Sequence, residues 1–186
     1  MIARNIQKSD GVVQEVPGFY GSVKIEEKVI QKIWKEQDFL TKSLFTECGK
    51  KIVVIDSGSW NLAEEGPDFM GAVLMIDGVQ HHGDVEIHFY PNQWCQHKHH
   101  QDSNFEKVLL QVSVFSGNGI SESVHTKNGK PIPTLVLLPH LFQSLEEYAE
   151  HYALAKLSGR LTDLDQFIAK LGSLTSVEVD KLALKR

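Results

Sequence analysis

Apolar residues recur at helical spacing early in the chain. Between residues 25 and 38 they repeat every three or four positions, as at Val29 and Ile33, which predicts an amphipathic helix. Glu26 and Glu27 lie in its first turn, where the helix dipole favours acidic side chains. Proline and glycine interrupt the preceding segment, so no long element is expected before this helix.

The middle of the chain alternates short β-branched runs with turn residues, a pattern typical of strands. We expect strands at residues 51–55, 69–76, 84–90, 108–115 and 134–138. The second and third are separated by Asp77-Gly78, a strong hairpin signal. Strict alternation in the third strand places Glu86 and His88 on one face.

The C-terminal part returns to helical spacing. Leucine, tyrosine and alanine positions predict helices over about 141–155 and 161–171, followed by a third short helix or a frayed tail up to Arg186. The expected fold is α+β: an N-terminal helix, a mostly antiparallel or mixed sheet with a central hairpin, and a helical C-terminal cap. We assign residues 1–139 to the core and 140–186 to the cap of the same domain.

The composition is that of an ordinary soluble domain. Of the 186 residues, 41% are hydrophobic and 23% charged, which excludes a disordered or collagen-like chain. The longest apolar run, residues 71–76, is far shorter than the roughly 20 residues of a membrane helix. Residues 1–10 lack the apolar core of a signal peptide. We therefore expect a cytoplasmic protein with no membrane partner.

The net charge and the cysteine spacing narrow the range of possible functions only slightly. The formal net charge of −5 gives no global attraction for nucleic acid, although a local basic groove or a bound metal ion would still provide one. Cys48 and Cys95 form neither a CxxC pair nor a zinc-finger spacing. We expect two reduced thiols, and the spacing leaves a disulfide open.

Six of the nine histidines lie between residues 81 and 100, and histidine is the commonest metal ligand. His97 and His100 are three apart and would share one face of a helix. With His88 and Asp102 they could form a site for zinc or nickel. In the alternative, some imidazoles are exposed and others attach a loop to the sheet.

Two acidic residues meet at the open end of the predicted hairpin. Asp68 precedes its first strand and Glu86 lies on the second, and paired carboxylates bind Mg²⁺ or Mn²⁺. A two-residue turn places Asp68 opposite Ile87, facing away from Glu86. A bulge, a longer loop, or an Asp68 outside the strand would bring both acids to one side. Otherwise Asp68 belongs to a Gly-Pro-Asp turn, and the Glu86–His88 face is solvated.

Several motifs follow one another in the order of an uncharacterised bacterial family. They are Glu26-Glu27-x-Val-Ile-Gln-x-Ile-Trp34, Trp60-Asn61, Gly66-Pro-Asp-Phe69, Gly83-Asp-Val-Glu-Ile-His88, Trp94-x-x-His97-x-His99-His100-x-Asp102 and Pro131-Ile-Pro-Thr-Leu135. On these motifs the chain resembles domain-of-unknown-function family 2851 over about residues 26–138. Phe105 and Gln111 depart from the Tyr and His that the resemblance leads us to expect. The family brings no established activity.

A more distant resemblance, to the PD-(D/E)xK nucleases, bears on the chemistry. Those enzymes share an order of elements: a helix carrying an acid, a strand, then a hairpin bearing Pro-Asp and Glu-x-Lys. This chain follows that order with Glu27, Pro67-Asp68 and Glu86-x-His88. The resemblance implies that Asp68 and Glu86 hold the metal, that Glu27 supports it, and that His88 replaces the usual Lys.

The leading hypothesis is a metal-dependent nuclease or phosphodiesterase with Mg²⁺ or Mn²⁺ as cofactor and nucleic acid as partner. Its catalytic residues would be Glu27, Asp68, Glu86 and His88. A first alternative is a non-enzymatic binding or scaffold domain in which the acids are structural. A second is the histidine-rich transition-metal site. The C-terminal helices would provide the face of a homodimer.

Overall fold

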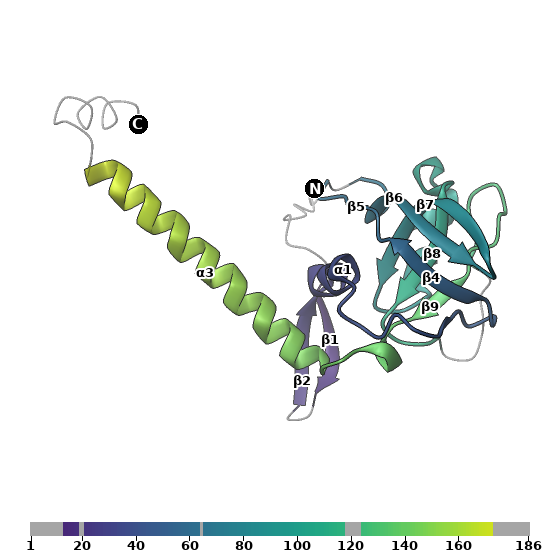
Figure 1. Ribbon diagram of the computed structural model, residues 1–186, viewed down its shortest axis with the longest axis horizontal. Coiled ribbons are helices and arrows are strands. Elements are labelled where there is room, and N and C mark those ends of the chain that lie inside the picture. The colour runs from purple at the N-terminus through teal and green to yellow at the C-terminus, as the bar shows by residue number, and fades with distance from the viewer. Residues whose placement is uncertain (1–12, 19–20, 64, 118–123, 173–186) are drawn as a thin grey trace, which may run out of the picture. The chain divides into compact units, whose positions relative to one another are not determined.

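Figure 1 shows a computed structural model of the chain, which describes residues 13–18, 21–63, 65–117 and 124–172. The α+β fold is confirmed, because the described residues form both helices and β-sheets. The chain divides into two compact units, Met1–Leu145 and Glu146–Arg186. The predictions for the N-terminal ten residues and for a third C-terminal helix lie outside the described residues.

A hairpin precedes the first helix and was not expected from the sequence. Strands β1 (Val13–Gly18) and β2 (Gly21–Glu26) are antiparallel and lead directly into α1 (Glu27–Glu36). The helix prediction from residue 25 was therefore wrong at its start, because Ile25 pairs with Gln14 across the hairpin. Glu27 becomes the first residue of the helix.

The core of the first unit is a seven-stranded mixed sheet. Its strands are β3 (Leu44–Phe45), β4 (Lys51–Asp56), β5 (Ser59–Trp60), β6 (Phe69–Ile76), β7 (Val79–His88), β8 (Val108–Ser113) and β9 (Thr134–Val136). Their order is β3-β4-β6-β7-β8-β9, with β5 paired to β6. Pairing is antiparallel as far as β7, whereas β7–β8 and β8–β9 are parallel. All five expected strands are present; the third begins earlier than expected and ends at His88.

The two ends of this sheet meet. Just beyond β3, Thr46 forms an antiparallel bridge with Leu135 of β9, and the Glu47 amide donates to the Thr134 carbonyl at 2.9 Å. The sheet is therefore strongly curved, as Figure 1 shows. Curvature of this kind encloses one face of the central strands, and α1 packs close to β7. Residues Asp84 to His88 of β7 are accordingly all buried.

Helix α1 is attached to the sheet by a tryptophan. Trp34 is fully buried, stacks on Phe39 with ring centroids 5.8 Å apart and donates from Nε1 to the Ser57 carbonyl at 3.2 Å. Burial of an indole stabilises the fold by several kcal/mol only when its N–H is satisfied, as it is here. Because α1 packs close to β7, the side chains of its first turns lie beside that strand.

The connection from β7 to β8 carries the histidine motif. It contains α2 (Gln93–Gln96) and two short 3₁₀ turns, His99–Gln101 and Ser103–Phe105. Trp94 holds this connection in place, because its buried ring packs in an apolar cluster with Phe105, Val108, Val124 and Ile132. Its Nε1 also donates to the His125 carbonyl at 3.0 Å.

In the described part of the C-terminal unit, up to residue 172, one helix stands where two were expected. α3 runs from Leu145 to Gly172 without interruption. Gly159 lies inside it, and a single glycine costs a helix only about 1 kcal/mol. Of the helices described, none combines the length and the apolar character needed to cross a bilayer. The capping and dimer roles of this helix stay predictions.

The hairpin β6–β7 contains a bulge. Ala72 pairs with Gly83 as a two-residue turn requires, but Phe69 pairs with Val85, so the register shifts by one between these pairs. Gly71 adopts a φ of +69° there, and its amide donates to Asp84 Oδ1 at 3.0 Å. Two of the register alternatives are observed: Asp68 lies just before β6, which begins at Phe69, and the bulge brings it level with Glu86.

Replacing Gly71 by alanine tests the bulge. The change is expected to lower the free energy of unfolding by about 1–2 kcal/mol, since a positive φ is unfavourable for a residue with a Cβ. Gly78→Ala at the hairpin tip is the matched control, because its φ is +83° and neither new Cβ meets an atom within 4 Å. Urea denaturation should show similar losses for both variants.

Only Gly71→Ala should also weaken the hydrogen-exchange protection of the Ile87 amide. That amide donates to the carboxylate of Asp68, whose position depends on the bulge. Equal protection of Ile87 in the two variants would show that the bulge does not set the register.

Candidate functional site

Asp68 and Glu86 are locked together by reciprocal hydrogen bonds. The Asp68 amide donates to Glu86 Oε2 at 3.0 Å, and the Ile87 amide donates to Asp68 Oδ2 at 2.9 Å. Each carboxylate thus accepts a backbone hydrogen bond from the strand that carries the other. Asp68 is partly buried. Glu86 is only 5% and His88 only 1% exposed, so the alternative of a solvated Glu-x-His face is wrong.

Helix α1 adds two side chains to this pair. Gln31 Nε2 donates to Asp68 Oδ1 at 2.7 Å and contacts Glu27 Oε1 at 3.4 Å. Gln31 Oε1 accepts from Trp60 Nε1 at 3.0 Å, which fixes the direction of the amide. The other oxygen of Glu27, Oε2, is buried and has no hydrogen-bond partner. Glu27, Asp68 and Glu86 therefore converge, and we call them the acid group.

The pKa values of all three carboxyl groups in the acid group are raised, because ionising them in this site is unfavourable. Burial, and secondarily the charge of Asp68, raises the pKa of Glu27 from 4.5 to about 8. Burial and Glu86 raise the pKa of Asp68 well above its ordinary value, and burial and Glu27 do the same for Glu86. Within the described part of the chain, no Lys or Arg side chain lies within 4 Å of these carboxylates. A proton or a cation from outside must compensate them.

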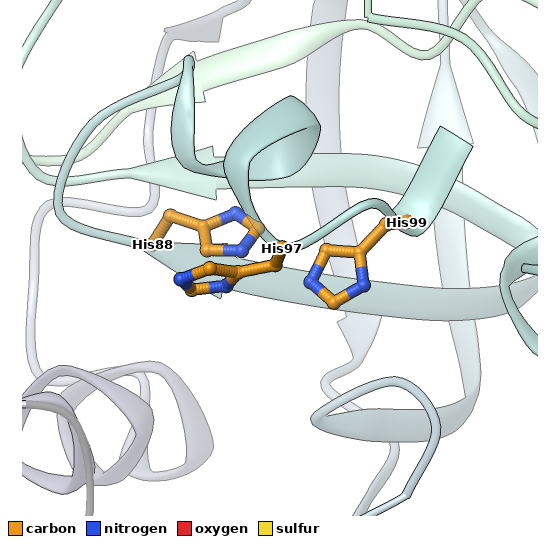
Figure 2. Close-up of side chains that lie close together, drawn as sticks. All are labelled: His88, His97 and His99. Atoms are coloured by element: carbon orange, nitrogen blue, oxygen red, sulfur yellow. The ribbon is translucent and has the colours of Figure 1, made fainter. Parts of the chain in front are cut away.

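Three histidines gather beside the acid group. Figure 2 shows the imidazoles of His88 from β7 and of His97 and His99 from the following connection grouped together. One ring nitrogen from each lies within 4.8 Å of the others, a spacing at which the three could bind one metal ion. Glu86 Oε1 lies 3.2 Å from His99 Nε2 and 3.6 Å from His88 Nε2. Glu86 therefore belongs to both groups.

These histidines do not neutralise the acids. Burial, followed by repulsion from His99 and His97, holds the pKa of His88 well below its ordinary value. Burial also lowers the pKa of His97 and lowers that of His99 to about 4. At neutral pH the three rings are thus uncharged, and each carries one ring nitrogen without a proton.

His100 and Asp102 do not join the three-histidine group. His100 Nε2 contacts Gln101 Nε2 at 2.9 Å, and Asp102 Oδ1 accepts from the Asn104 amide. The expected helical spacing of His97 and His100 is absent because α2 ends at Gln96 and Lys98 turns the chain with a φ of +63°.

That turn directs His99 inward instead. Its ring stacks on Phe105 with centroids 3.9 Å apart. His99 was missed as a site residue, since no spacing rule singles it out from its neighbours. Gln111 of β8 was also missed, although it lies 3.1 Å from His88 Nδ1. In the sequence it was noticed only as a departure from an expected His.

Comparison with known proteins gives one result. The profile of a family described as "Protein of unknown function (DUF2851)" matches residues 27–186. The match therefore includes α1, the whole sheet, the histidine connection and the C-terminal unit, and extends beyond the 26–138 region of the expected resemblance. No curated protein and no solved structure matches the chain.

The loss of stability caused by ionisation of the buried Glu27 carboxyl can be measured. Its pKa is about 8 in the folded state and 4.5 ordinarily, so folding is penalised increasingly as pH rises from 4.5 to 8. In excess EDTA, Glu27→Gln is expected to raise the thermal unfolding midpoint by about 5 °C at pH 8, and by much less at pH 5.

The control is Glu36→Gln at the exposed end of the same helix, which should leave the midpoint unchanged at both pH values. A Glu27→Gln effect that is the same at pH 5 and pH 8 would contradict a raised pKa at this carboxyl.

Proposed function

We propose that this chain, which belongs to the DUF2851 family of unknown function, is a metal-dependent hydrolase of phosphodiester bonds. The observation that carries the proposal is the convergence of three carboxylates, of which Glu27 and Glu86 are buried and Asp68 is partly buried, with no Lys or Arg within 4 Å among the described residues. Such a group is unfavourable for the fold by itself. Clusters of ionisable groups with strongly shifted pKa values are typical of catalytic and ligand-binding sites.

The residues fit a hard divalent cation. Mg²⁺ and Mn²⁺ take carboxylate oxygens as ligands. Glu27 Oε2 has no hydrogen-bond partner, and each oxygen of Asp68 accepts one hydrogen bond and keeps a second lone pair. Asp68 and Glu86 would hold the ion and Glu27 would support it from α1. The two positive charges of the ion would also offset the effects of burial and of mutual repulsion that raise these pKa values.

The surrounding residues suit the hydrolysis of a phosphodiester. A bound divalent ion would supply Lewis-acid stabilisation of the phosphoryl oxygens and a water of lowered pKa. His88, two residues after Glu86, presents its buried Nε2 toward Glu86 Oε1. It can therefore orient a water or a phosphoryl oxygen by a hydrogen bond.

The order of elements supports the same proposal. Glu27 lies on α1, the strand β4 follows, and the hairpin β6–β7 carries Asp68 before its first strand and Glu86 on its second. That is the order of the PD-(D/E)xK nucleases, which favours nucleic acid as the substrate class. The protein carries a formal net charge of −5, so the bound ion would provide the local positive charge that faces a phosphate.

A nuclease assay with Mn²⁺ tests this function. On single- and double-stranded DNA and RNA, Glu86→Gln and Asp68→Asn should each lower the cleavage rate by at least about 100-fold, because the ion loses a ligand. Glu36→Gln should cleave at the wild-type rate. Circular dichroism confirms that each variant is folded.

Wild-type protein that neither binds Mn²⁺ by calorimetry nor cleaves any of these substrates would refute the proposal. Together with an unchanged fold in Glu86→Gln, that result would favour the non-enzymatic binding or scaffold domain.

A transition-metal site is the second candidate, favoured by the three-histidine group. Its ring nitrogens lie within 4.8 Å of one another, and neutral imidazole is a ligand for zinc and nickel. This set differs from the expected one, with His99 in place of His100 and Glu86 nearby in place of Asp102. Both candidates use the carboxylate of Glu86.

Metal analysis of the purified protein separates the two candidates. If the histidine site is occupied, zinc or nickel should be present at about one ion per chain. His97→Ala and His99→Ala should then lower the content by at least about tenfold, whereas His100→Ala should not change it. Equal metal content in all three variants would exclude this site.

A further inference from the structure

Gln111 is a buried glutamine whose amide is hydrogen-bonded on both sides. It is fully inaccessible to solvent. Its Nε2 donates to the Pro91 carbonyl at 3.0 Å and lies 3.1 Å from His88 Nδ1. Its Oε1 accepts from the Thr134 hydroxyl at 3.2 Å. All these partners come from the strands β7 to β9 and the residues next to them, so the amide is enclosed by residues of neighbouring strands and shielded from solvent.

The orientation of this amide follows from its partners. A carbonyl oxygen only accepts, so the NH₂ of Gln111 must face Pro91. The reverse orientation would place two oxygens 3.0 Å apart without a hydrogen between them. Since the same NH₂ carries a second hydrogen, that hydrogen is directed to His88 Nδ1. Gln111 is therefore a donor to His88.

A neutral imidazole carries one N–H and one acceptor nitrogen. With Nδ1 accepting from Gln111, the proton of His88 lies on Nε2. That nitrogen is buried and has no hydrogen-bond partner, and the carboxylate oxygen nearest to it is Glu86 Oε1 at 3.6 Å. The N–H thus points into the space that Glu86 and His99 also face.

We propose that Gln111 is a positioning residue, which holds His88 as the Nε2–H tautomer so that a neutral hydrogen-bond donor is directed at the acid group. His88 would donate to a water or phosphoryl oxygen bound beside Glu86, where the nuclease resemblance has Lys. The use of this donor in catalysis rests on the proposed function, whereas the tautomer itself does not.

The same geometry bears on the transition-metal candidate. A histidine that binds a metal through Nε2 carries its proton on Nδ1 and donates it to a neighbouring acceptor. Gln111 offers a donor at that point instead. His88 is therefore assigned to hydrogen bonding, and His97 and His99 remain as the imidazoles available to an ion.

The tautomer can be read directly by NMR. In metal-free, full-length protein labelled with ¹⁵N-histidine, a long-range ¹H–¹⁵N correlation at pH 7 should show His88 with a protonated Nε2 and an unprotonated Nδ1. The His88 signals are assigned by their loss in His88→Gln. A wild-type spectrum with the proton on Nδ1 would overturn the proposal.

Two variants test the part played by Gln111. Gln111→Glu keeps the shape but replaces the donor with an acceptor, so the proton of His88 should move to Nδ1. Gln111→Met removes the donor, and the single Nε2–H pattern should give way to a mixture of tautomers. Gln93→Met is the matched control: Gln93 is also buried, but its Oε1 accepts from the Tyr90 amide. An Nε2–H pattern that persists in both Gln111 variants would also overturn the proposal.

Kinetics then separate this inference from the proposed function. With a DNA substrate, Gln111→Glu should lower kcat by at least about tenfold with little change in the Mn²⁺ concentration that gives half the maximal rate, because binding of the ion does not involve His88. An Nε2–H tautomer in a protein without phosphodiesterase activity would refute the function and leave the tautomer assignment standing. Activity with an unchanged kcat in a Gln111→Glu protein of reversed tautomer would refute the role given to His88.

Discussion

The reciprocal pair of hydrogen bonds between Asp68 and Glu86 is the interaction on which the site depends. It forms only because two residues, Met70 and Gly71, stand opposite the single residue Asp84 in the β6–β7 hairpin. In a regular hairpin the two carboxylates would face opposite sides of the sheet. A change of one residue in the register therefore separates a structural hairpin from one that carries a pair of converging acids.

Around this pair the protein accepts an unfavourable arrangement of charge. Three carboxyl groups, of which Glu27 and Glu86 are buried and Asp68 is partly buried, lie together, and their pKa values are raised by loss of solvent and by one another. The imidazoles beside them are neutral at physiological pH because burial lowers their pKa values. The fold tolerates this because the surrounding scaffold is extensive: the curved sheet encloses one face of β7, α1 packs against that strand, and Trp34 and Trp94 hold α1 and the histidine connection in place.

Most of the fold could be predicted, and the failures have local explanations. The five predicted strands are present, since β-branched runs bounded by turn residues are a strong local signal. The hairpin β1–β2 was missed because Pro17 and the flanking glycines suggested a break, although Val23 and Ile25 alternate with polar residues as in a strand. His99 was missed because a left-handed residue, Lys98, ends the helical spacing that had favoured His100.

The sequence by itself determined the chemistry present at the site: acidic residues at Glu27, Asp68 and Glu86, and a histidine two residues after Glu86 on the same strand face. Only the tertiary structure decided which of these groups meet. The bulge, the approach of α1 with Gln31, and the contact of Gln111 with His88 Nδ1 all join residues distant in the chain. Periodicity describes neighbours along one element, whereas register and hydrogen-bond direction between elements depend on how the whole sheet closes.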